Sequence, residues 1–274
     1  MGIIKSKYVF LFLCLCGLVV LASPGTGRAD HIRFYVDGLP PYAVLQDQGP
    51  PTGFAVDLMG RLMHSVGEHF APTDIKVMTW ARAVHEVEVV PGTALLVLAK
   101  LPERLSSFKW VGPLDTLPIG VLARKDSGIT VQEIGDLKEH SIGMVRNTAP
   151  YLVLTNTLPG LGQNLVLLSG IPAQLRMLRE GRVDLIVQAV DASNRLMDEE
   201  GMESADYHVV YRFEPLRIYF GFNKSTDDRL IRRLQAALNR FKEGDSSGTS
   251  PYDRLRQEYF GWAAPDSSEK AGAQ

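Results

Sequence analysis

One arginine follows a buried strand directly, in a position where it could bind a carboxylate. The apolar run 93–99 (TALLVLA) has the composition of a buried strand, and a proline breaks it in the following segment, which ends at Arg104. A guanidinium group keeps its charge and donates two parallel hydrogen bonds to a carboxylate. The alternative is an ordinary surface charge paired with Glu103 or Glu86, and the residue types alone leave both readings open.

A second candidate for anion binding lies in the loop that contains Asn147 and Thr148. Thr148 follows a predicted strand over 141–145 and precedes a helix that Pro150 opens. Its hydroxyl and the neighbouring N–H groups would form an anion-binding site at the helix N-terminus. Simple capping of the helix has the same geometry and is the alternative.

Three further side chains lie where strands and loops meet. Asp37 ends the first predicted strand, where it either faces a ligand or forms a turn beside Gly38. Trp80 is expected at the end of a strand over 74–80, and Tyr42 lies in a proline-rich loop. Both rings could stack on a ligand, although aromatic side chains more often belong to the core.

Other kinds of site leave no trace in the sequence. The six histidines show no metal-binding spacing, and the sequence contains no P-loop, no G-x-S-x-G and no H-E-x-x-H motif. We therefore expect neither a metal nor a cofactor. The formal net charge of −2, without a strongly basic patch, argues against a nucleic-acid partner.

Strands and helices alternate along the chain and then the pattern restarts. Strands are expected over 31–38, 74–80 and 93–99, with helices over 54–67 and 81–92 between them. Such alternation predicts an α/β fold with a mostly parallel sheet. A second α/β unit runs from about 117 to 212. A strand over 215–225 and a helix over 226–244 then follow, so the chain is expected to return to the first unit.

The N-terminal segment predicts export. Two lysines precede the uncharged apolar run 8–22, and small and helix-breaking residues follow it, which is typical of a secretory signal peptide. We expect cleavage after Ala29, or secondarily after Ala22, and an uncleaved anchor is the alternative. Cleavage removes Lys5, Lys7 and Arg28, which changes the net charge from −2 to about −5, and removes Cys14 and Cys16. The exported chain then contains no cysteine.

The order of several short motifs resembles the family 3 extracellular solute-binding proteins, the periplasmic receptors of polar amino-acid ABC transporters. These motifs are YVDGLPPY, GFAVDLMGRLMHSVG, VMTW, LPERLSSFKWVGP, IGMVRNT, LREGRVDLIVQ, FGFNKS, LQAALNRFKEG and YFG. The resemblance covers about 31–261. It implies a type II periplasmic binding fold with two lobes and two crossover strands as a hinge. Lobe 1 would comprise 30–113 and 216–262 and lobe 2 would comprise 114–215, with a signal peptide over 1–29 and a disordered tail over 263–274.

The resemblance also assigns roles to the candidate residues. Arg104 aligns with the arginine that clamps a ligand α-carboxylate, and the loop of Thr148 would hold the other side of that carboxylate. Asp37 stands where the family often places an acid that receives a ligand amine. We therefore predict a ligand-binding set, which consists of Arg104, Thr148, Asp37, Trp80, Tyr42, Ala99, Asn147 and Asp191.

The chain departs from the family pattern at three places, one of which is VPGT (90–93) where the family usually has G-K-x-D before the third strand. Ala99 and its neighbours stand where amino-acid binders usually carry serine or threonine, and Ala189 stands where an acid is usual. Asp191 would share the face of Ala189 if both lay in one strand, and could then replace the missing acid. Recognition of a carboxylate thus survives the comparison better than recognition of an amine.

These observations predict a monomeric periplasmic protein, not an enzyme, that captures a small carboxylate-bearing solute by lobe closure and delivers it to an ABC permease. The alternatives are a cyclohexadienyl dehydratase-like enzyme, with Glu103 or His85 as general acid, and a sensory module of a partner receptor.

Overall fold

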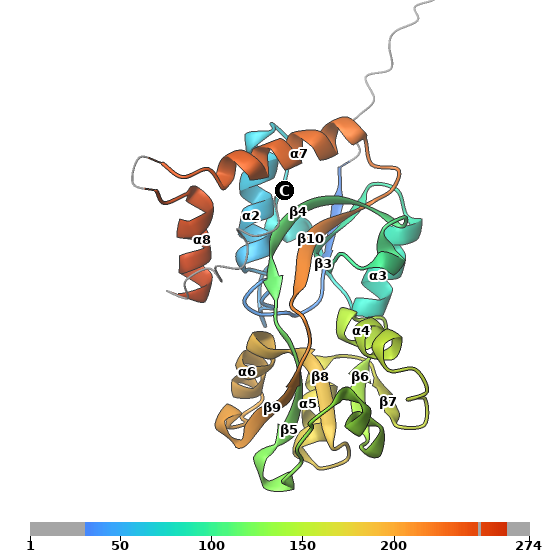
Figure 1. The fold of residues 1–274 in the computed structure, drawn as a ribbon. Coiled ribbons are helices and arrows are strands. Elements are labelled where there is room, and N and C mark those ends of the chain that lie inside the picture. Colours follow the sequence, from blue (N-terminus) through green and yellow to red (C-terminus); the bar gives the residue numbers. More distant parts are fainter. Residues whose placement is uncertain (1–30, 246–247, 262–274) are drawn as a thin grey trace, which may run out of the picture. The chain divides into compact units, whose positions relative to one another are not determined.

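The computed structural model describes residues 31–245 and 248–261, which form two five-stranded sheets with helices packed against both (Figure 1). The predicted signal peptide and the predicted disordered tail lie outside the described residues. The α/β class predicted from the alternating pattern is confirmed. How the chain divides into lobes stays a prediction.

The first sheet has the strand order β2-β1-β3-β10-β4. Its strands are β1 (Arg33–Val36), β2 (Ile75–Val77), β3 (Thr93–Ala99), β4 (Phe108–Leu117) and β10 (Leu216–Asn223). The helices that accompany it are α2 (Phe54–Ser65), α3 (Trp80–Val89), α7 (Asp228–Phe241) and α8 (Pro251–Phe260).

Both faces of this sheet are covered, which explains why every residue of β3 is buried. Side chains alternate between the two faces of a strand. Phe34 and Leu96 therefore belong to the same apolar cluster as α2, whereas Tyr35 and Leu95 pack in a cluster with α3. Burying both faces requires a continuous apolar run rather than an alternating one.

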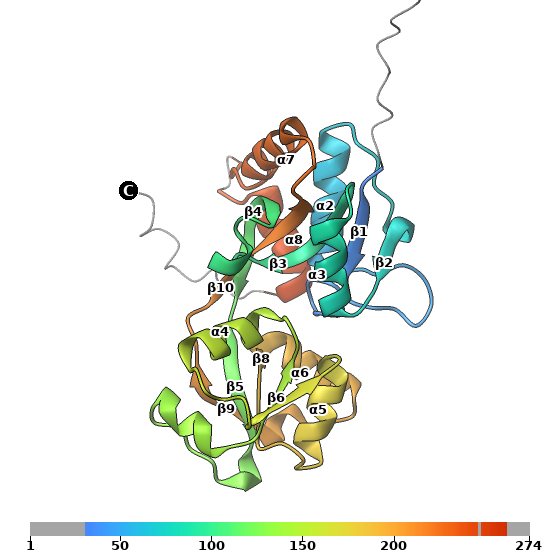
Figure 2. The same cartoon turned by 90° about the vertical axis from the view of Figure 1, so that its right-hand side faces the viewer.

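The second sheet has the strand order β7-β6-β8-β5-β9. Its strands are β5 (Ile119–Arg124), β6 (Ile142–Val145), β7 (Leu165–Leu168), β8 (Leu185–Ala189) and β9 (Tyr207–Arg212). One face packs in a cluster with α5 (Ile171–Arg179) and α6 (Val190–Glu199), and the other packs with α4 (Ala149–Thr157) (Figure 2). Five short 3₁₀ segments complete the described elements, namely Pro72–Asp74, Pro102–Arg104, Lys125–Ser127, Ile134–Glu139 and Ser204–Asp206.

Each sheet is mixed, although the sequence pattern predicts mostly parallel sheets. In the first sheet β1 pairs parallel with β2 and β3, while β10 pairs antiparallel with β3 and β4. In the second, β6 pairs parallel with β7 and β8, while β5 pairs antiparallel with β8 and β9. The antiparallel pairs arise because the strands that pass between the sheets return beside each other.

Two adjacent segments carry the chain between the sheets. Only Pro118 separates β4 from β5, and residues 213–215 separate β9 from β10. Leu117 pairs with Leu216, and Asp115 pairs with Ile218, so the crossing segments are hydrogen-bonded to each other. These are the places where the resemblance puts the hinge.

The start of α3 differs from the prediction. Trp80 was expected to end a strand, but β2 ends at Val77 and Trp80 is the first residue of α3. The physical reason is a capping contact: the Trp80 N–H donates to Oδ2 of Asp37 at 2.8 Å, which satisfies a free donor of the first helical turn. Sequence composition near Trp80 does not reveal this distant acceptor.

Candidate functional site

Elements of both sheets line one cavity in the described structure. Its empty space is about 660 Å³, part of which is open to solvent. Most of the lining side chains are apolar, and the residues are Tyr35, Val36, Asp37, Gly38, Leu39, Trp80, Leu95, Val97, Ala99, Leu117, Val145, Thr148, Ala149, Pro150, Ile171, Gln188 and Ile218. A mostly apolar cavity with a few polar groups is a typical small-molecule site.

Arg104 is buried rather than on the surface; it is not among the cavity-lining residues, but it contacts Ala99, which is one of them. Its 3₁₀ turn follows β3, and the residue is only 4% exposed. Nη2 donates to the carbonyl oxygen of Asn147 at 2.6 Å, and Nη1 donates to that of Ala99 at 3.4 Å. Burial lowers the pKa of Arg104 to about 10, against the opposing effect of Glu88 and Glu103. The guanidinium is therefore charged at neutral pH, and a solvated surface charge does not describe it.

The Asn147 carbonyl oxygen receives a second donor from the first sheet's helices. Nε1 of Trp80 donates to it at 2.8 Å, and the Trp80 ring lies 5.9 Å from the Arg104 guanidinium carbon. Asn147 has a φ of 57°, and it is the one non-glycine residue with positive φ among those described. We call each sheet with the helices packed on it one half of the structure. Two side chains of the first half thus donate to a single backbone oxygen of the second half.

Thr148 lines the cavity and caps α4. Its hydroxyl donates to the Val145 carbonyl at 2.8 Å and accepts the Tyr151 N–H at 3.4 Å. The capping role is thus present in the structure, and its place at the cavity wall keeps the anion-binding reading open. The first turn of α4 then contributes its positive end to the cavity.

Asp37 is the one carboxyl group among the described residues that line the cavity. Its oxygens accept the Gly38 N–H and the Trp80 N–H, both at 2.8 Å. Burial raises the pKa of Asp37, and these two hydrogen bonds oppose the rise. Asp37 therefore has a clear structural role at the start of α3, in addition to any contact with a ligand.

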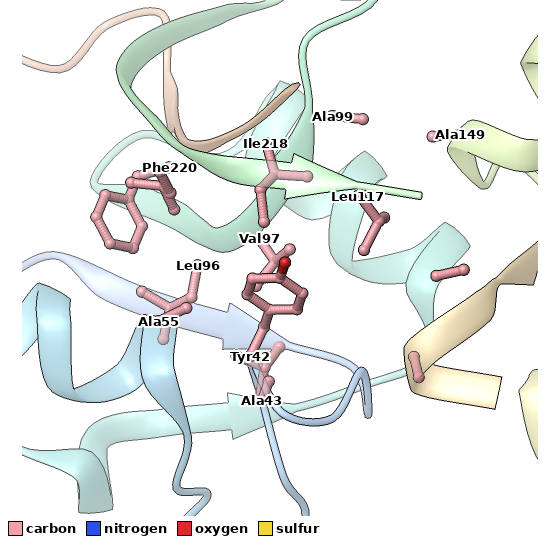
Figure 3. Close-up of a cluster of buried hydrophobic side chains, with 14 of the residues drawn as sticks. Tyr42, Ala43, Ala55, Leu96, Val97, Ala99, Leu117, Ala149, Ile218 and Phe220 are labelled. Atoms are coloured by element: carbon pink, nitrogen blue, oxygen red, sulfur yellow. The ribbon is translucent and has the colours of Figure 1, made fainter. Parts of the chain in front are cut away.

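Tyr42 lies in the core and not on the cavity wall. It is 3% exposed, and Figure 3 shows its ring among Ala43, Val97 and Ile218. Its hydroxyl lies 3.2 Å from both Oδ2 of Asp115 and the Thr116 carbonyl oxygen, in the first crossing segment. The structure gives Tyr42 a packing role next to the predicted hinge.

Asp191 does not share a strand face with Ala189, and that expectation is wrong. The strand β8 ends at Ala189, and Asp191 lies exposed in the first turn of α6. A helix begins here, so the two-residue period of a strand no longer applies. Ala189 itself is fully buried and is not among the cavity-lining residues.

Sequence reasoning missed Gln188, which lies on β8 and lines the cavity at 3% exposure. Its Nε2 donates to Oε1 of Gln174 at 3.1 Å, and its Oε1 accepts the Ala189 N–H at 2.9 Å. The signal that could have found it is a glutamine inside the apolar run LIVQAV. A buried amide needs hydrogen-bonding partners, so its presence there indicates a specific role.

The general-acid candidates of the enzymatic alternative are not at the cavity. Glu103 and His85 are exposed, and neither lines it. Glu103 instead accepts a hydrogen bond from Asn156 of α4. Within residues 31–245 and 248–261, no group of three or more histidine, cysteine or acidic side chains could hold a metal. In the same ranges, no helix is long and apolar enough to span a membrane.

Comparison with known structures identifies the fold. A histidine kinase sensor domain with similarity to periplasmic binding proteins matches with a TM-score of 0.73 at 20% identity, over 85% of this chain and 98% of its own. An ancestral arginine-binding protein bound to glutamine matches with 0.70 at 16% identity, over 85% and 98%. The holo arginine-binding protein of T. maritima matches with 0.66 at 18% identity, over 85% and 96%. The fold is thus that of type II periplasmic binding proteins.

The family follows from the sequence match. The model of the bacterial extracellular solute-binding proteins, family 3, matches residues 32–261, and the chain belongs to that family. The resemblance inferred from the ordered motifs is confirmed. No curated protein gives a significant match.

Proposed function

We propose that this protein is an exported, periplasmic solute-binding protein that captures a small carboxylate-bearing solute and delivers it to an ABC permease. The observation that carries this proposal is the buried guanidinium of Arg104, which reaches from the turn after β3 to the Asn147 carbonyl of the other half. Burying a charged group costs free energy, and a buried charge that is retained is therefore a candidate for binding a ligand of opposite charge.

Two of the five N–H groups of Arg104 are used by the carbonyl oxygens of Ala99 and Asn147. The others remain to bind a ligand carboxylate. The N-terminus of α4, which Thr148 caps, would face the same anionic group from the second half. Contacts from both halves favour the closed form, so the ligand shifts the population toward closure.

A thermal-shift screen tests this proposal. The purified protein is screened against amino acids, dipeptides and small organic acids, and a tight ligand raises Tm by mass action. Loss of a charged hydrogen-bonding partner costs about 1.5–3 kcal/mol, so Arg104→Ala should weaken binding of each hit by about 10- to 100-fold. Arg104→Lys keeps the charge but not the planar guanidinium group, so its affinity for each hit should lie between those of the wild type and Arg104→Ala.

The control removes an exposed arginine of α7 by the change Arg232→Ala, which should leave every hit unchanged. Hits that appear equally strongly in Arg104→Ala and in the wild type would refute the carboxylate-binding role of Arg104. Turnover of a ring acid such as prephenate by the purified protein would favour an enzyme instead.

A further inference from the structure

We propose that Gln188 determines the specificity of the cavity, and that the solute is a monocarboxylic acid with an apolar body and no ammonium group. This inference rests on the proposed function and deepens it by naming the ligand class. It is carried by a fixed amide donor in the cavity wall and by the apolar side chains opposite.

The orientation of the Gln188 amide is fixed by the residue behind it. Gln174 is fully buried, and its Nε2 donates to the carbonyl oxygens of Gly143 at 2.8 Å and Val187 at 3.2 Å. Both hydrogens of that amide are thereby used, so Gln174 can present only its oxygen to Gln188. The Gln188 atom that faces this oxygen must therefore be the donor, Nε2.

The other end of the Gln188 amide agrees with this orientation. Its oxygen accepts the backbone N–H of Ala189 at 2.9 Å, and a reversed amide would place two donors against each other. One hydrogen of Nε2 goes to Gln174, and the second has no partner within the described part of the chain. A buried donor at the wall of a cavity favours an acceptor on the ligand, and an ammonium group placed against it would set donor against donor.

The remaining walls also disfavour an ammonium group. From the first sheet, Val97, Ala99 and Ile218 line the cavity with apolar side chains. From the second sheet and its helices α4 and α5, Val145, Ala149 and Ile171 do the same. An unpaired cation against such walls would lose its hydration without compensation. An aliphatic or aromatic body, in contrast, gains about 25 cal/mol for each Å² of apolar surface that is buried.

Asp37 is the one acidic group among the described residues that line the cavity, and so the one that could form an ion pair with an ammonium group. Each of its oxygens already accepts a backbone N–H, and these bonds hold the start of α3. We therefore assign Asp37 to the architecture of the wall, and the experiment includes a variant that tests this assignment directly.

Matched ligand pairs separate the two classes of solute. The wild-type protein is titrated calorimetrically with 4-methylpentanoate, 2-oxo-4-methylpentanoate and L-leucine, and with 3-phenylpropanoate, phenylpyruvate and L-phenylalanine. We expect at least one acid to bind about tenfold or more tightly than the amino acid with the same skeleton, since the site leaves the ammonium without a partner. This comparison needs no variant, so it is independent of any folding defect.

Variants then assign the preference to a residue. Gln188→Met keeps the length of the side chain and removes the donor, and we expect the acids to bind about tenfold more weakly, since one hydrogen bond is lost. Asp37→Asn should leave the acids bound, and the exposed change Arg232→Ala should alter nothing. Circular dichroism and Tm verify that each variant is folded.

Three results would overturn the inference. Suppose that the amino acids bind as tightly as the acids and that Asp37→Asn abolishes their binding. The cavity would then recognise the ammonium group. Acids that bind equally to the wild type and to folded Gln188→Met would remove the role of Gln188. Failure of all six compounds to bind would exclude the ligand class. In each case the dependence of other hits on Arg104 still decides whether the proposed function stands.

Discussion

At the scale of single residues, Asn147 shows how local backbone conformation builds the contact between the halves. Its φ of 57° places it in the left-handed region, which asparagine tolerates better than most residues. Its carbonyl oxygen accepts from both Arg104 and Trp80. The side chain itself is exposed, so the backbone of this residue matters more than its amide.

Substitutions at Asn147 should therefore follow backbone preference. Asn147→Gly should keep the free energy of unfolding within about 0.5 kcal/mol of wild type or raise it slightly, because glycine adopts positive φ without strain. Asn147→Ala should lower it by about 1 kcal/mol, since a Cβ without a compensating side-chain bond is disfavoured there. Urea denaturation measures both, and a more stable alanine variant would contradict the argument.

At the scale of elements, Asp184 joins the starts of β6 and β8. Its Oδ2 accepts the Ser141 N–H at 2.8 Å and the Ser141 hydroxyl at 2.7 Å, just before β6 begins. Desolvation acts to raise the pKa of Asp184, but the bonds from Ser141 outweigh it and lower the pKa below the usual 3.8. The charged form is thus favoured in the folded state.

A depressed pKa in the folded state gives a stabilising contribution that is present above the unfolded pKa and is lost as the pH falls through the folded value. At pH 7, Asp184→Asn should lower the free energy of unfolding by about 1 kcal/mol, because solvent screening at this exposed position reduces the roughly 1.5–3 kcal/mol of a hydrogen bond to a charged group. The difference from wild type should shrink below about pH 4. Urea denaturation between pH 7 and pH 3 checks this.

Asp198→Asn, on the exposed side of α6, is the matched control for that pH series. It lacks the Ser141 contact and should follow the wild type throughout. A deficit in Asp184→Asn that stays constant from pH 7 to pH 3 would show that the effect is not linked to protonation.

The sequence predicted long periodic elements well and their contacts poorly. The predicted strand over 93–99 is β3 with the same bounds, and the predicted helix over 54–67 is α2 apart from its last two residues. Composition and periodicity decide such elements. The start of α3 at Trp80 was missed because its capping oxygen belongs to Asp37, more than forty residues away in the chain.

The candidate site shows the same division. The motif order singled out Arg104 and Thr148, whose ligand-binding roles stay predictions. In the structure Thr148 lines the cavity and Arg104 contacts the lining residue Ala99, and only the fold assembles those walls. The motif order could not place Asp191, because the end of β8 decides whether a two-residue offset means the same face. Gln188 and Gln174 were invisible as a pair, since they come from β8 and α5 and meet only after folding.

At the scale of the whole molecule, the Asn147 carbonyl joins the two halves through its bonds from Trp80 and Arg104. Trp80 supplies one of its two donors, and Trp110 offers a matched comparison. Nε1 of Trp110 also donates to a carbonyl oxygen, that of Leu105, at 3.5 Å, but within the same half. Removing each indole N–H therefore separates a contact across the halves from one inside a half.

We expect Trp80→Phe to increase the population of open conformations, whereas Trp110→Phe should not. Spin labels at exposed Lys76→Cys and Lys138→Cys, one in each half, report the distance between them once Cys14 and Cys16 are replaced by serine. Pulsed electron–electron double resonance should show a broader distribution with a longer mean distance in Trp80→Phe, and no such change in Trp110→Phe. Identical distributions in both variants would mean that the Trp80 bond does not hold the halves together.

The placement of the Trp80 indole has a practical consequence. When its N–H leaves the Asn147 oxygen, the ring passes from a protein acceptor to water, and its ultraviolet emission should move to longer wavelength. With Trp110 and Trp262 both replaced by phenylalanine, Trp80 is the one remaining tryptophan, and its emission shift would report opening in an unlabelled sample. The intrinsic fluorescence of Trp80 could therefore be followed while solutes are added one after another.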